Sequence, residues 1–415
     1  MLDRTEIMHK LATKICLILA ILSQAVYGTT YLKEIPASDV LAKIDKNELI
    51  MYDHVIIKGD LDVNNLTLLG KNDNNHIRSS IIIRNSRIDG NVSVRLFTFE
   101  GYVNFRGSQF NGTSDYLGSQ FSNVADFTNT KFNGNARFSA SKFNGMVLFD
   151  GTQFNGEADF TVSQFSTAVF IDSMFNGMAN FGETEFNGLA LFDGTQFNGE
   201  ADFLVSKFND VASFNRTKFN GNADFRESQF ERSTVFKGDR FGLPPNFNGA
   251  KFDGYVSDWA SLKSGIFDEK SYLSLIKSLR ETGLFGDAND CYYTYRIHHM
   301  SNLFDYLSWM SCGFGVSWLQ TIYFGIFWLI SFGLVYFIMI SDSNEINDIH
   351  KLFEALGFSA VVLLSVPSEL YPRRTSKYKE YAKQIKFPLP ILERLIGWGL
   401  LILFINTLSR LMIQY

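Results

Sequence analysis

The sequence predicts a mainly β protein, in which a β-helix is followed by short helices and a two-helix transmembrane domain. Phenylalanine recurs from about residue 99 to residue 252 at spacings that alternate between five and six. Self-similarity at a short fixed period is typical of a solenoid. A charged and then apolar N-terminus is typical of an export signal. Two apolar stretches near the C-terminus are each long enough to cross a bilayer.

Residues 1–28 have the layout of a secretory signal peptide. Arg4, Lys10 and Lys14 precede an apolar run over residues 15–25, and small residues follow before Thr29. The run is too short to span a bilayer comfortably, so cleavage is expected. An uncleaved anchor stays open as an alternative. Both versions carry the following residues out of the cytoplasm.

Residues 29–98 are predicted to form an N-terminal β segment that caps the solenoid. Residues 55–63 and 80–90 combine β-branched side chains with turn residues, but they lack the regular phenylalanines. Terminal repeats of a solenoid are expected to be atypical because they cover its open end.

Residues 99–254 are predicted to form the solenoid, because a period near 5.5 suits a chain that turns a corner every five or six residues. Most of these Phe residues are preceded, two residues earlier, by Ala, Ser or Thr. Alternate residues of an extended segment share a face, so both side chains should point inward, while the polar residues between them form an outer wall. The predicted core includes Phe132, Phe138, Phe143, Phe149, Phe154, Phe160, Phe197, Phe203, Phe208, Phe214, Phe219 and Phe225.

The repeat unit resembles that of the pentapeptide-repeat family, which reads A-[DN]-[LF]-x-x. Ala158-Asp159-Phe160, Ala201-Asp202-Phe203 and Ala223-Asp224-Phe225 match its core. The resemblance implies a right-handed, four-sided β-helix, and at four units per coil the block gives about seven coils. The chain departs from the family by one extra residue in every second unit, carried by Asn-Gly in the pattern FNGxAxF and expected on a turn. That residue is missing over residues 165–175, so one face should be tighter there.

Residues 255–316 are predicted to form a helical connector. Residues 271–280 place apolar side chains at helical spacing, Gly283 should end that helix, and residues 288–300 should form a second one. Neither the cysteines nor the histidines of this segment have metal-ligand spacing, so no metal site and no cofactor are expected. We expect the connector to pack rather than to bind a ligand.

Residues 317–340 and 392–413 are predicted to be transmembrane helices, joined by a loop over residues 341–391. Trp309 and Trp318 would lie at the membrane interface. The loop and its margins carry many basic residues, whereas the segment before the first span has only Arg296 and two histidines. Basic loops stay in the cytoplasm, so the repeat domain should lie outside. The basic residues are Lys351, Arg373, Arg374, Lys377, Lys379, Lys383, Lys386 and Arg394.

The C-terminal region resembles the two-span domains of potassium channels. The resemblance rests on residues 309–316, the first span, the Ala355–Ser359 segment and residues 392–408. In that family, Ala-Leu-x-Phe-Ser opens a pore helix that leads into a filter of the form T-x-G-Y-G-D. The matching stretch lacks the glycines that a carbonyl-lined filter needs, so potassium selectivity is not implied. These degenerate filter positions are Ser365, Val366, Pro367, Ser368, Glu369 and Leu370.

Residues 352–366 are apolar but too short to span, so we expect a re-entrant or interfacial helix in contact with both spans. Glu393 and Arg394 are expected at the cytoplasmic end of the second span, with Arg410 reaching outward near the C-terminus. Asn406 is expected inside the span, in a helix–helix hydrogen bond. With both resemblances together, the chain is similar to a methanogen-type group of exported pentapeptide-repeat membrane proteins.

The function expected from the sequence is non-enzymatic. The chain lacks a nucleophile elbow, a His-Glu-x-x-His motif and a phosphate-binding glycine loop, so no catalytic residue is assigned. A net charge of −5 argues against a nucleic-acid partner. We expect a membrane-anchored, surface-exposed module that binds or spaces an unknown extracellular ligand or protein. The alternative is a non-potassium-selective pore with an extracellular repeat cap, and association of copies through the spans stays open.

Overall fold

The computed structural model describes residues 32–66, 75–254, 256–257, 259–340, 349–366, 385 and 388–412. The signal peptide expected over residues 1–28 lies outside these residues. The chain divides into two compact units, which are described separately. The first comprises the residues up to Ser257 together with Ser264–Ile266, and the second comprises the rest.

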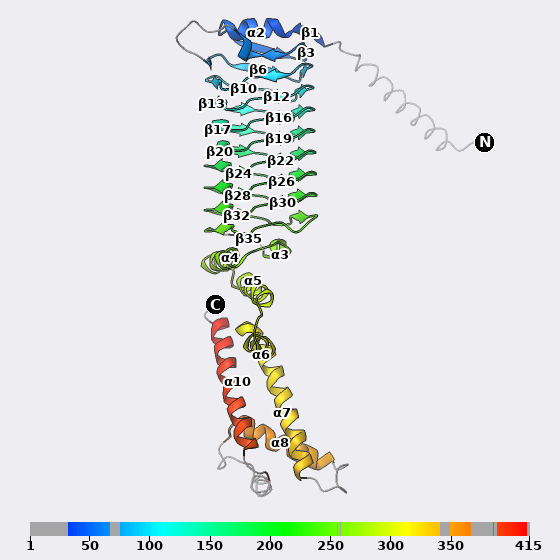
Figure 1. The fold of residues 1–415 in the computed structure, drawn as a ribbon, viewed down its shortest axis with the longest axis vertical. Coiled ribbons are helices and arrows are strands. Elements are labelled where there is room, and N and C mark those ends of the chain that lie inside the picture. The colour runs from blue at the N-terminus through cyan, green and yellow to red at the C-terminus, as the bar shows by residue number, and fades with distance from the viewer. Residues whose placement is uncertain are drawn as a thin grey trace, which may run out of the picture. The chain divides into compact units, whose positions relative to one another are not determined.

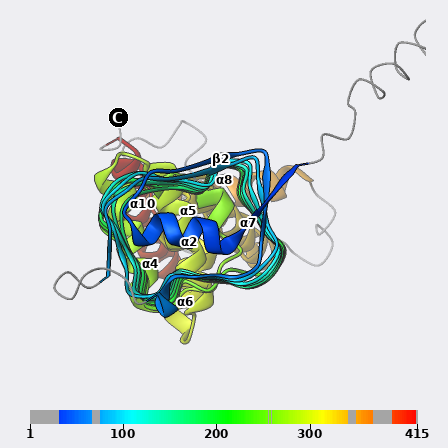
Figure 2. The same ribbon diagram turned by 90° about the horizontal axis from the view of Figure 1, so that it is seen from above.

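The first unit is a parallel β-solenoid, as the sequence predicted (Figure 1). It has about ten turns rather than about seven, because strands before residue 99 belong to the same sheets. Its coils have four faces, and each strand pairs with the strand one coil away (Figure 2). The first face contains β1 (Lys33–Pro36), β3 (Val55–Lys58), β7 (Arg87–Ile88), β11 (Gln109–Phe110), β15 (Lys131–Phe132), β18 (Gln153–Phe154), β21 (Met174–Phe175), β25 (Gln196–Phe197), β29 (Lys218–Phe219) and β33 (Arg240–Phe241). The second contains β4 (Leu61–Asp62), β8 (Val92–Ser93), β12 (Ser114–Asp115), β16 (Ala136–Arg137), β19 (Ala158–Asp159), β22 (Ala179–Asn180), β26 (Ala201–Asp202) and β30 (Ala223–Asp224).

The other two faces are joined into one sheet by two longer strands, β17 (Lys142–Leu148) and β20 (Gln164–Val169), which run across both. The third face adds β5 (His76–Ile77), β9 (Thr98–Phe99), β13 (Gln120–Phe121), β23 (Glu185–Phe186), β27 (Lys207–Phe208), β31 (Gln229–Phe230) and β34 (Lys251–Phe252). The fourth adds β2 (Ile50–Asp53), β6 (Ile81–Arg84), β10 (Val103–Asn104), β14 (Ala125–Asp126), β24 (Ala190–Leu191), β28 (Ala212–Ser213), β32 (Thr234–Val235) and β35 (Val256–Ser257).

The predicted phenylalanines fill the interior of the solenoid, and all twelve are buried. Rings of successive coils stack, as between Phe138 and Phe160, whose ring centroids lie 5.2 Å apart at 3°. Rings of different columns meet edge to face, as between Phe138 and Phe149 at 5.6 Å. Offset stacking and edge-to-face contacts are the arrangements that aromatic rings prefer. The fixed phenylalanine register therefore becomes continuous aromatic columns, in which each coil contacts only its neighbours.

The small residue two positions before Phe also points inward, as predicted, and the structure adds a reason for its hydroxyl. Thr152, for example, is fully buried, and its Oγ1 donates to the Phe127 carbonyl at 2.7 Å. Other inward hydroxyls make the equivalent bond, each donating to a backbone carbonyl about one coil earlier in the chain. These hydroxyls belong to Thr130, Ser141, Ser163, Ser173, Thr184, Thr195, Ser206, Thr217 and Ser228. Sequence reasoning found the size of these residues but not this role.

The extra residue of the repeat lies where the sequence predicted. Pairing of β17 with β20 shifts register between Phe143 and Met146, around the Asn144-Gly145 insertion, because β20 lacks the extra residue. The glycine of this motif is required by close packing between coils. A Cβ on Gly134 would lie 2.6 Å from the Gly112 carbonyl oxygen of the preceding coil.

The N-terminal cap differs from the all-β segment expected over residues 29–98. Helix α2 (Ala37–Asp45) lies across the end of the solenoid, and its apolar face, with Val40 and Ile44, is buried (Figure 2). A short 3₁₀ turn, η1 (Val63–Asn65), follows β4. The expectation failed for residues 37–45 because the β-branched segments around them dominated the pattern. A helix covers the first coil's interior where no earlier coil is available to do so.

The second unit is helical. It contains α3 (Trp259–Leu262), α4 (Glu269–Glu281), α5 (Phe285–His298), α6 (Leu303–Cys312), η2 (Gly313–Gly315), α7 (Trp318–Ile340), α8 (Ile349–Leu363) and α10 (Leu389–Met412). The two connector helices are confirmed as α4 and α5. Asp268 caps α4 by accepting from the Ser271 backbone N–H, and Gly283 follows its end with φ of +80°. Cys291 and Cys312 are both free and buried.

Candidate functional site

A ladder of asparagine side chains runs along one corner of the solenoid wall. The Nδ2 of each Asn donates to the Oδ1 of the Asn one coil earlier, at 2.7–2.9 Å. The first member, Asn111, donates to Asp89, which also pairs with Lys58 and Arg87. The members are Asn111, Asn133, Asn155, Asn176, Asn198 and Asn220. The ladder explains why the repeat carries Asn before the close-packed Gly.

The wall also carries carboxylates, and no Lys or Arg occurs between Lys142 and Lys207. Burial raises the pKa of the Asp150 carboxyl above its usual value, a hydrogen bond to its own backbone opposes this effect, and the nearby carboxylates of Asp126 and Asp172 raise the pKa further. Among the described residues, no group of three or more His, Cys, Asp or Glu side chains could hold a metal ion. The sequence interpretation of these acids as a polar wall is consistent with this geometry.

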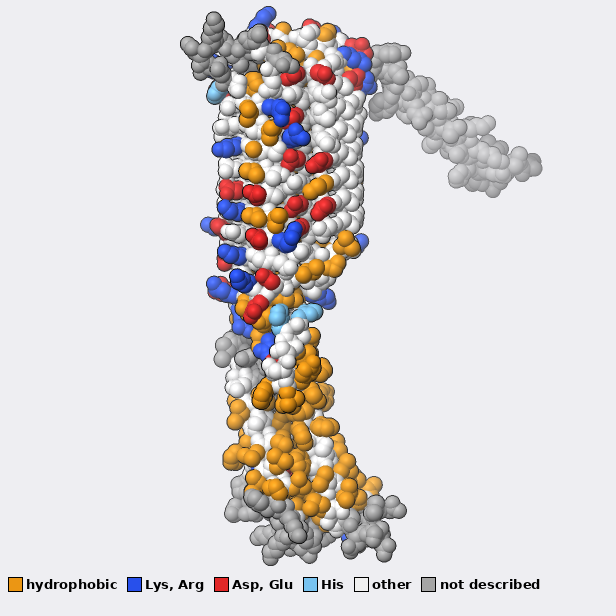
Figure 3. Space-filling view, in the orientation of Figure 1, with side chains coloured by type: hydrophobic (Ala, Val, Ile, Leu, Met, Phe, Trp, Pro, Cys, Tyr) orange, Lys and Arg blue, Asp and Glu red, His pale blue; other side chains and the backbone are white. Residues whose placement is uncertain are grey.

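Two helices of the second unit are long and apolar enough to cross a membrane: α7, and α10 over Leu389–Ser409. The most apolar windows of these helices are only 22% and 11% buried, so most of their apolar surface is uncovered (Figure 3). Helix α6 is similar, because Leu303 and Phe304 are 70% and 80% exposed. Exposed apolar surface of this extent marks an interaction surface rather than the core of a soluble protein.

Helix α8 packs against both of these helices. Phe332 and Tyr336 of α7 form a buried cluster with Ala355, Phe358 and Val362 of α8. A Cβ on Gly397 of α10 would lie within 2 Å of the Leu363 carbonyl oxygen, so α10 approaches the end of α8 closely. The expected contact of segment 352–366 with both spans is confirmed, and the helix begins three residues earlier, at Ile349.

A carboxyl group lies inside this three-helix cluster. Glu393 of α10 is fully buried. Its Oε2 accepts from the Tyr336 hydroxyl of α7 at 2.6 Å, and its Oε1 lies 2.5 Å from the Ser359 hydroxyl of α8. Ser359 Oγ also lies 2.9 Å from the Leu329 carbonyl of α7. One acidic side chain therefore connects three helices, which is unusual enough among apolar helices to make this cluster the candidate site.

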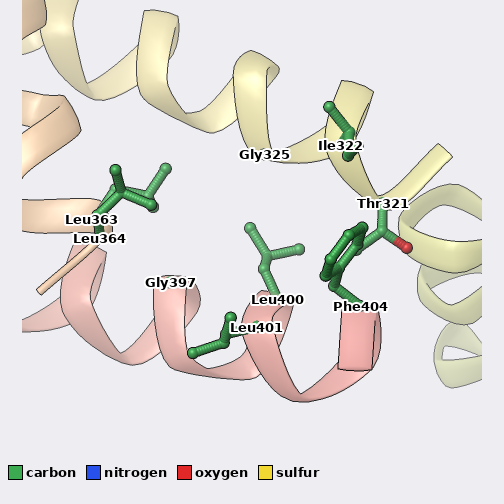
Figure 4. Close-up of a pocket in the computed structure, with 9 residues that line it drawn as sticks. All are labelled: Thr321, Ile322, Gly325, Leu363, Leu364, Gly397, Leu400, Leu401 and Phe404. Carbon is green, nitrogen blue, oxygen red and sulfur yellow. The ribbon is translucent and has the colours of Figure 1, made fainter. Parts of the chain in front are cut away.

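An apolar groove lies beside the candidate site, between α7, the end of α8 and α10 (Figure 4). Its cavity volume is about 220 Å³. Gly325 leaves room on α7, and Thr321 is the only polar side chain among the described residues of the lining. The other lining residues are Ile322, Leu363, Leu364, Gly397, Leu400, Leu401 and Phe404. The groove can accept hydrocarbon but offers few groups for a polar ligand.

The degenerate filter positions are only partly described. Ser365 and Val366 follow α8, with Ser365 in the left-handed region at φ of +51°, which ends the helix. Pro367, Ser368, Glu369 and Leu370 lie outside the described residues.

One expectation about the polar residues of the second span was wrong, and another stays a prediction. Glu393 lies close to the start of α10, where it is buried against α7 and α8, and its place at the cytoplasmic end of the span stays a prediction. Asn406, expected to bond another helix, has an exposed side chain. The partners of Glu393 come from segments separated by 34 and 57 residues, so no local pattern reveals the cluster. The sequence signal for this cluster was Glu393, an acidic residue inside an apolar run. No sequence signal marked Ser359 or Tyr336.

The repeat block matches the family described as pentapeptide repeats (9 copies), over residues 116–164 and 214–257. No curated protein and no solved structure matches the chain. Over these residues the repeats of the solenoid are thus similar to pentapeptide repeats, and the two-span channel resemblance stays an expectation.

Proposed function

We propose that this pentapeptide-repeat chain is a membrane-anchored, surface-exposed module that acts without catalysis, by binding or spacing a partner outside the cell. The partner is an unidentified extracellular ligand or protein, and the anchor is formed by α7 and α10. Pentapeptide-repeat solenoids are typically structural or binding modules, which supports a non-enzymatic role.

The observation that carries the proposal is the contrast between the surfaces of the two units. The solenoid buries its phenylalanines and presents Asn, Gln, Ser, Thr and charged side chains. Helices α7 and α10 expose the apolar surface that a bilayer would cover. Exposed Leu303, Phe304 and Tyr306 of α6, together with Trp309 and Trp318, suit the membrane interface, where aromatic side chains gather.

Orientation in this proposal rests on charge. The segment between the spans carries most of the basic residues near the membrane, and such segments stay in the cytoplasm. An N-terminal export signal is consistent with the same orientation. Together they favour a solenoid outside the cell.

Alkaline extraction of membranes that contain the full chain tests the anchor. Integral proteins stay in the membrane pellet, and proteins held only by charge are released. We expect the full chain to stay in the pellet at both high salt and high pH. Release of the chain into the supernatant would refute the anchor and leave only a soluble repeat module.

A second candidate function is a non-potassium-selective pore, favoured by the packing of α8 between α7 and α10. This arrangement is what the two-span channel resemblance implies, with a homo-oligomer formed through the spans. Reconstitution of the purified chain in planar bilayers would test it. Absence of conductance, combined with a monomer in mild detergent, would remove the pore from consideration.

A further inference from the structure

We infer that Glu393, Tyr336 and Ser359 form a proton-binding site inside the helical unit, in which the Glu393 carboxyl takes up and releases a proton without rearrangement of α7, α8 or α10. This inference goes beyond the proposed anchoring function and does not depend on which side of a membrane the solenoid occupies.

The first argument is the cost of burial. Glu393 is 0% exposed, and no salt bridge joins it to a cation among the described residues. An ionised carboxylate without a paired cation is expensive to remove from water, and a neutral carboxyl is much less so. Burial therefore favours a bound proton, whereas hydrogen bonds from neighbouring hydroxyls favour the ionised form. Both influences act on the same group.

The second argument is the number of protons on the hydroxyl groups. Ser359 has one hydroxyl proton but lies within hydrogen-bond distance of two acceptors, Glu393 Oε1 at 2.5 Å and the Leu329 carbonyl at 2.9 Å. It can donate to only one of them at a time. When Glu393 does not accept the Ser359 hydroxyl proton, Ser359 can donate that proton to the Leu329 carbonyl instead.

These contacts satisfy both protonation states. In the ionised state, Tyr336 donates to Oε2 and Ser359 donates to Oε1. When one proton from solvent adds to Oε1, that O–H donates to Ser359 Oγ, and the Ser359 proton turns to the Leu329 carbonyl. Tyr336 continues to donate to Oε2. Apart from the added proton, only the Ser359 hydroxyl proton changes position, so proton uptake leaves the packing of α7, α8 and α10 unchanged.

Among the residues that the structure describes, few other titratable groups face the carboxyl. Tyr336 is the titratable side chain of α7 in contact with it. On α8, His350, Lys351 and Glu354 precede Ser359 by more than one helical turn. On α10, the neighbouring Arg394 carries a positive charge and is exposed. Within the described part of the chain, the site is thus one carboxyl in contact with two hydroxyls, with one cation next to it in the sequence.

Infrared spectroscopy of the full chain in detergent tests the proposal, through the carbonyl stretching band of protonated carboxyls. At pH about 6, exposed carboxyls with pKa values of about 4 are ionised and do not contribute. We expect the wild-type spectrum to contain a protonated-carboxyl band that the Glu393→Gln variant lacks. The glutamine can keep both contacts, because its amide N–H donates to Ser359 and its oxygen accepts from Tyr336.

Two further variants distinguish proton binding from a purely structural role. Tyr336→Phe removes the donor to the carbonyl oxygen and should raise the frequency of the band. Ser359→Thr keeps the hydroxyl and should leave the band in place. Identical spectra of wild type and Glu393→Gln at pH about 6 would overturn the proposal. If Glu393→Gln does not fold, a band that Tyr336→Phe fails to shift would overturn it equally.

Discussion

Tyr116 is the one residue in its interior column that is not phenylalanine between residues 116 and 247. Its ring stacks on Phe138 at 5.0 Å, but its hydroxyl is buried and has no hydrogen-bond partner among the described residues. Burial raises the pKa of this phenol, so the group is neutral and unpaired. An unpaired buried hydroxyl costs about 1–3 kcal/mol.

Tyr116→Phe should therefore stabilise the solenoid by about 1–3 kcal/mol, because it removes the hydroxyl and keeps the ring. The midpoint of chemical denaturation, followed by near-ultraviolet circular dichroism, measures this change. Phe138→Tyr is the matched control, since it introduces the same hydroxyl one coil further on and should destabilise the chain. A lower midpoint for Tyr116→Phe would show that the hydroxyl has a partner.

Asp150 predicts a pH dependence of stability. Its pKa is raised in the folded chain, mainly by burial, so the folded state holds the proton more tightly than the unfolded state. Its contribution is therefore most favourable below pH about 4 and is lost as the pH rises through the folded pKa. Asp150→Asn should match the wild type at pH about 3 and become the more stable protein above pH about 5.

Asp193→Asn is the matched control for this prediction, because residues 148–160 and 191–203 are identical in sequence. The Asp193 carboxylate accepts from the Ser213 hydroxyl at 3.0 Å, so loss of its charge weakens a favourable bond. Thermal midpoints of the three proteins from pH 3 to pH 8 make the comparison. A gain of equal size in both variants would contradict the assignment to Asp150.

At the scale of the element, the asparagine ladder is a separable source of stability. Asn155 takes part in two ladder bonds, as donor to Asn133 and as acceptor from Asn176, each at 2.8 Å. Exposed hydrogen bonds of this kind contribute about 0.5 kcal/mol each, at the low end of the usual range. Asn155→Ala should therefore destabilise the solenoid by about 1 kcal/mol.

Asn144→Ala provides the control for the ladder. Asn144 stands in the same Phe-Asn-Gly context on another corner, but its side chain makes no hydrogen bond to another described side chain. The difference in denaturation midpoint between Asn155→Ala and Asn144→Ala measures the contribution of the ladder bonds, because both variants share the effect of replacing Asn by Ala. Equal midpoints would show that the ladder adds nothing measurable.

Elements that repeat along the chain could be predicted from the sequence, because the spacing of their repeated residues indicates their geometry. The inward phenylalanines, the inward small residues and the Asn-Gly bulge opposite β20 all follow from period and register. Helix α2 was missed although Ala37, Val40 and Ile44 stand at helical spacing, because it is short, occurs once and lies among β-branched segments. The hydrogen bonds from the inward Ser and Thr hydroxyls were also missed. The size and polarity of a side chain do not show which backbone carbonyl of the neighbouring coil lies within reach of it.

The Glu393 site shows the same limit in the helical unit. Apolar length identified α7 and α10, and the contact of α8 with both could be predicted because a short apolar helix needs cover. Which polar side chains meet depends on the rotation of three helices about their axes. Sequence periodicity does not fix that rotation when a helix is apolar on all sides.

At the scale of the whole molecule, the central claim is that the repeat unit lies outside the cell and the basic inter-span segment lies inside. Cysteine labelling with a membrane-impermeant maleimide tests both halves in one experiment. The native Cys291 and Cys312 are buried, so they should contribute little background. Lys131→Cys reports on the exposed wall of the solenoid, and Ser376→Cys reports on the basic segment between the spans.

The first measurement is therefore labelling of these two variants on intact and on permeabilised cells, with the parent chain as background. We predict that Lys131→Cys is labelled on intact cells and that Ser376→Cys is labelled only after permeabilisation. The reverse pattern would place the solenoid in the cytoplasm and the inter-span segment outside, as in working channels. That result would contradict the surface-module account and favour the pore.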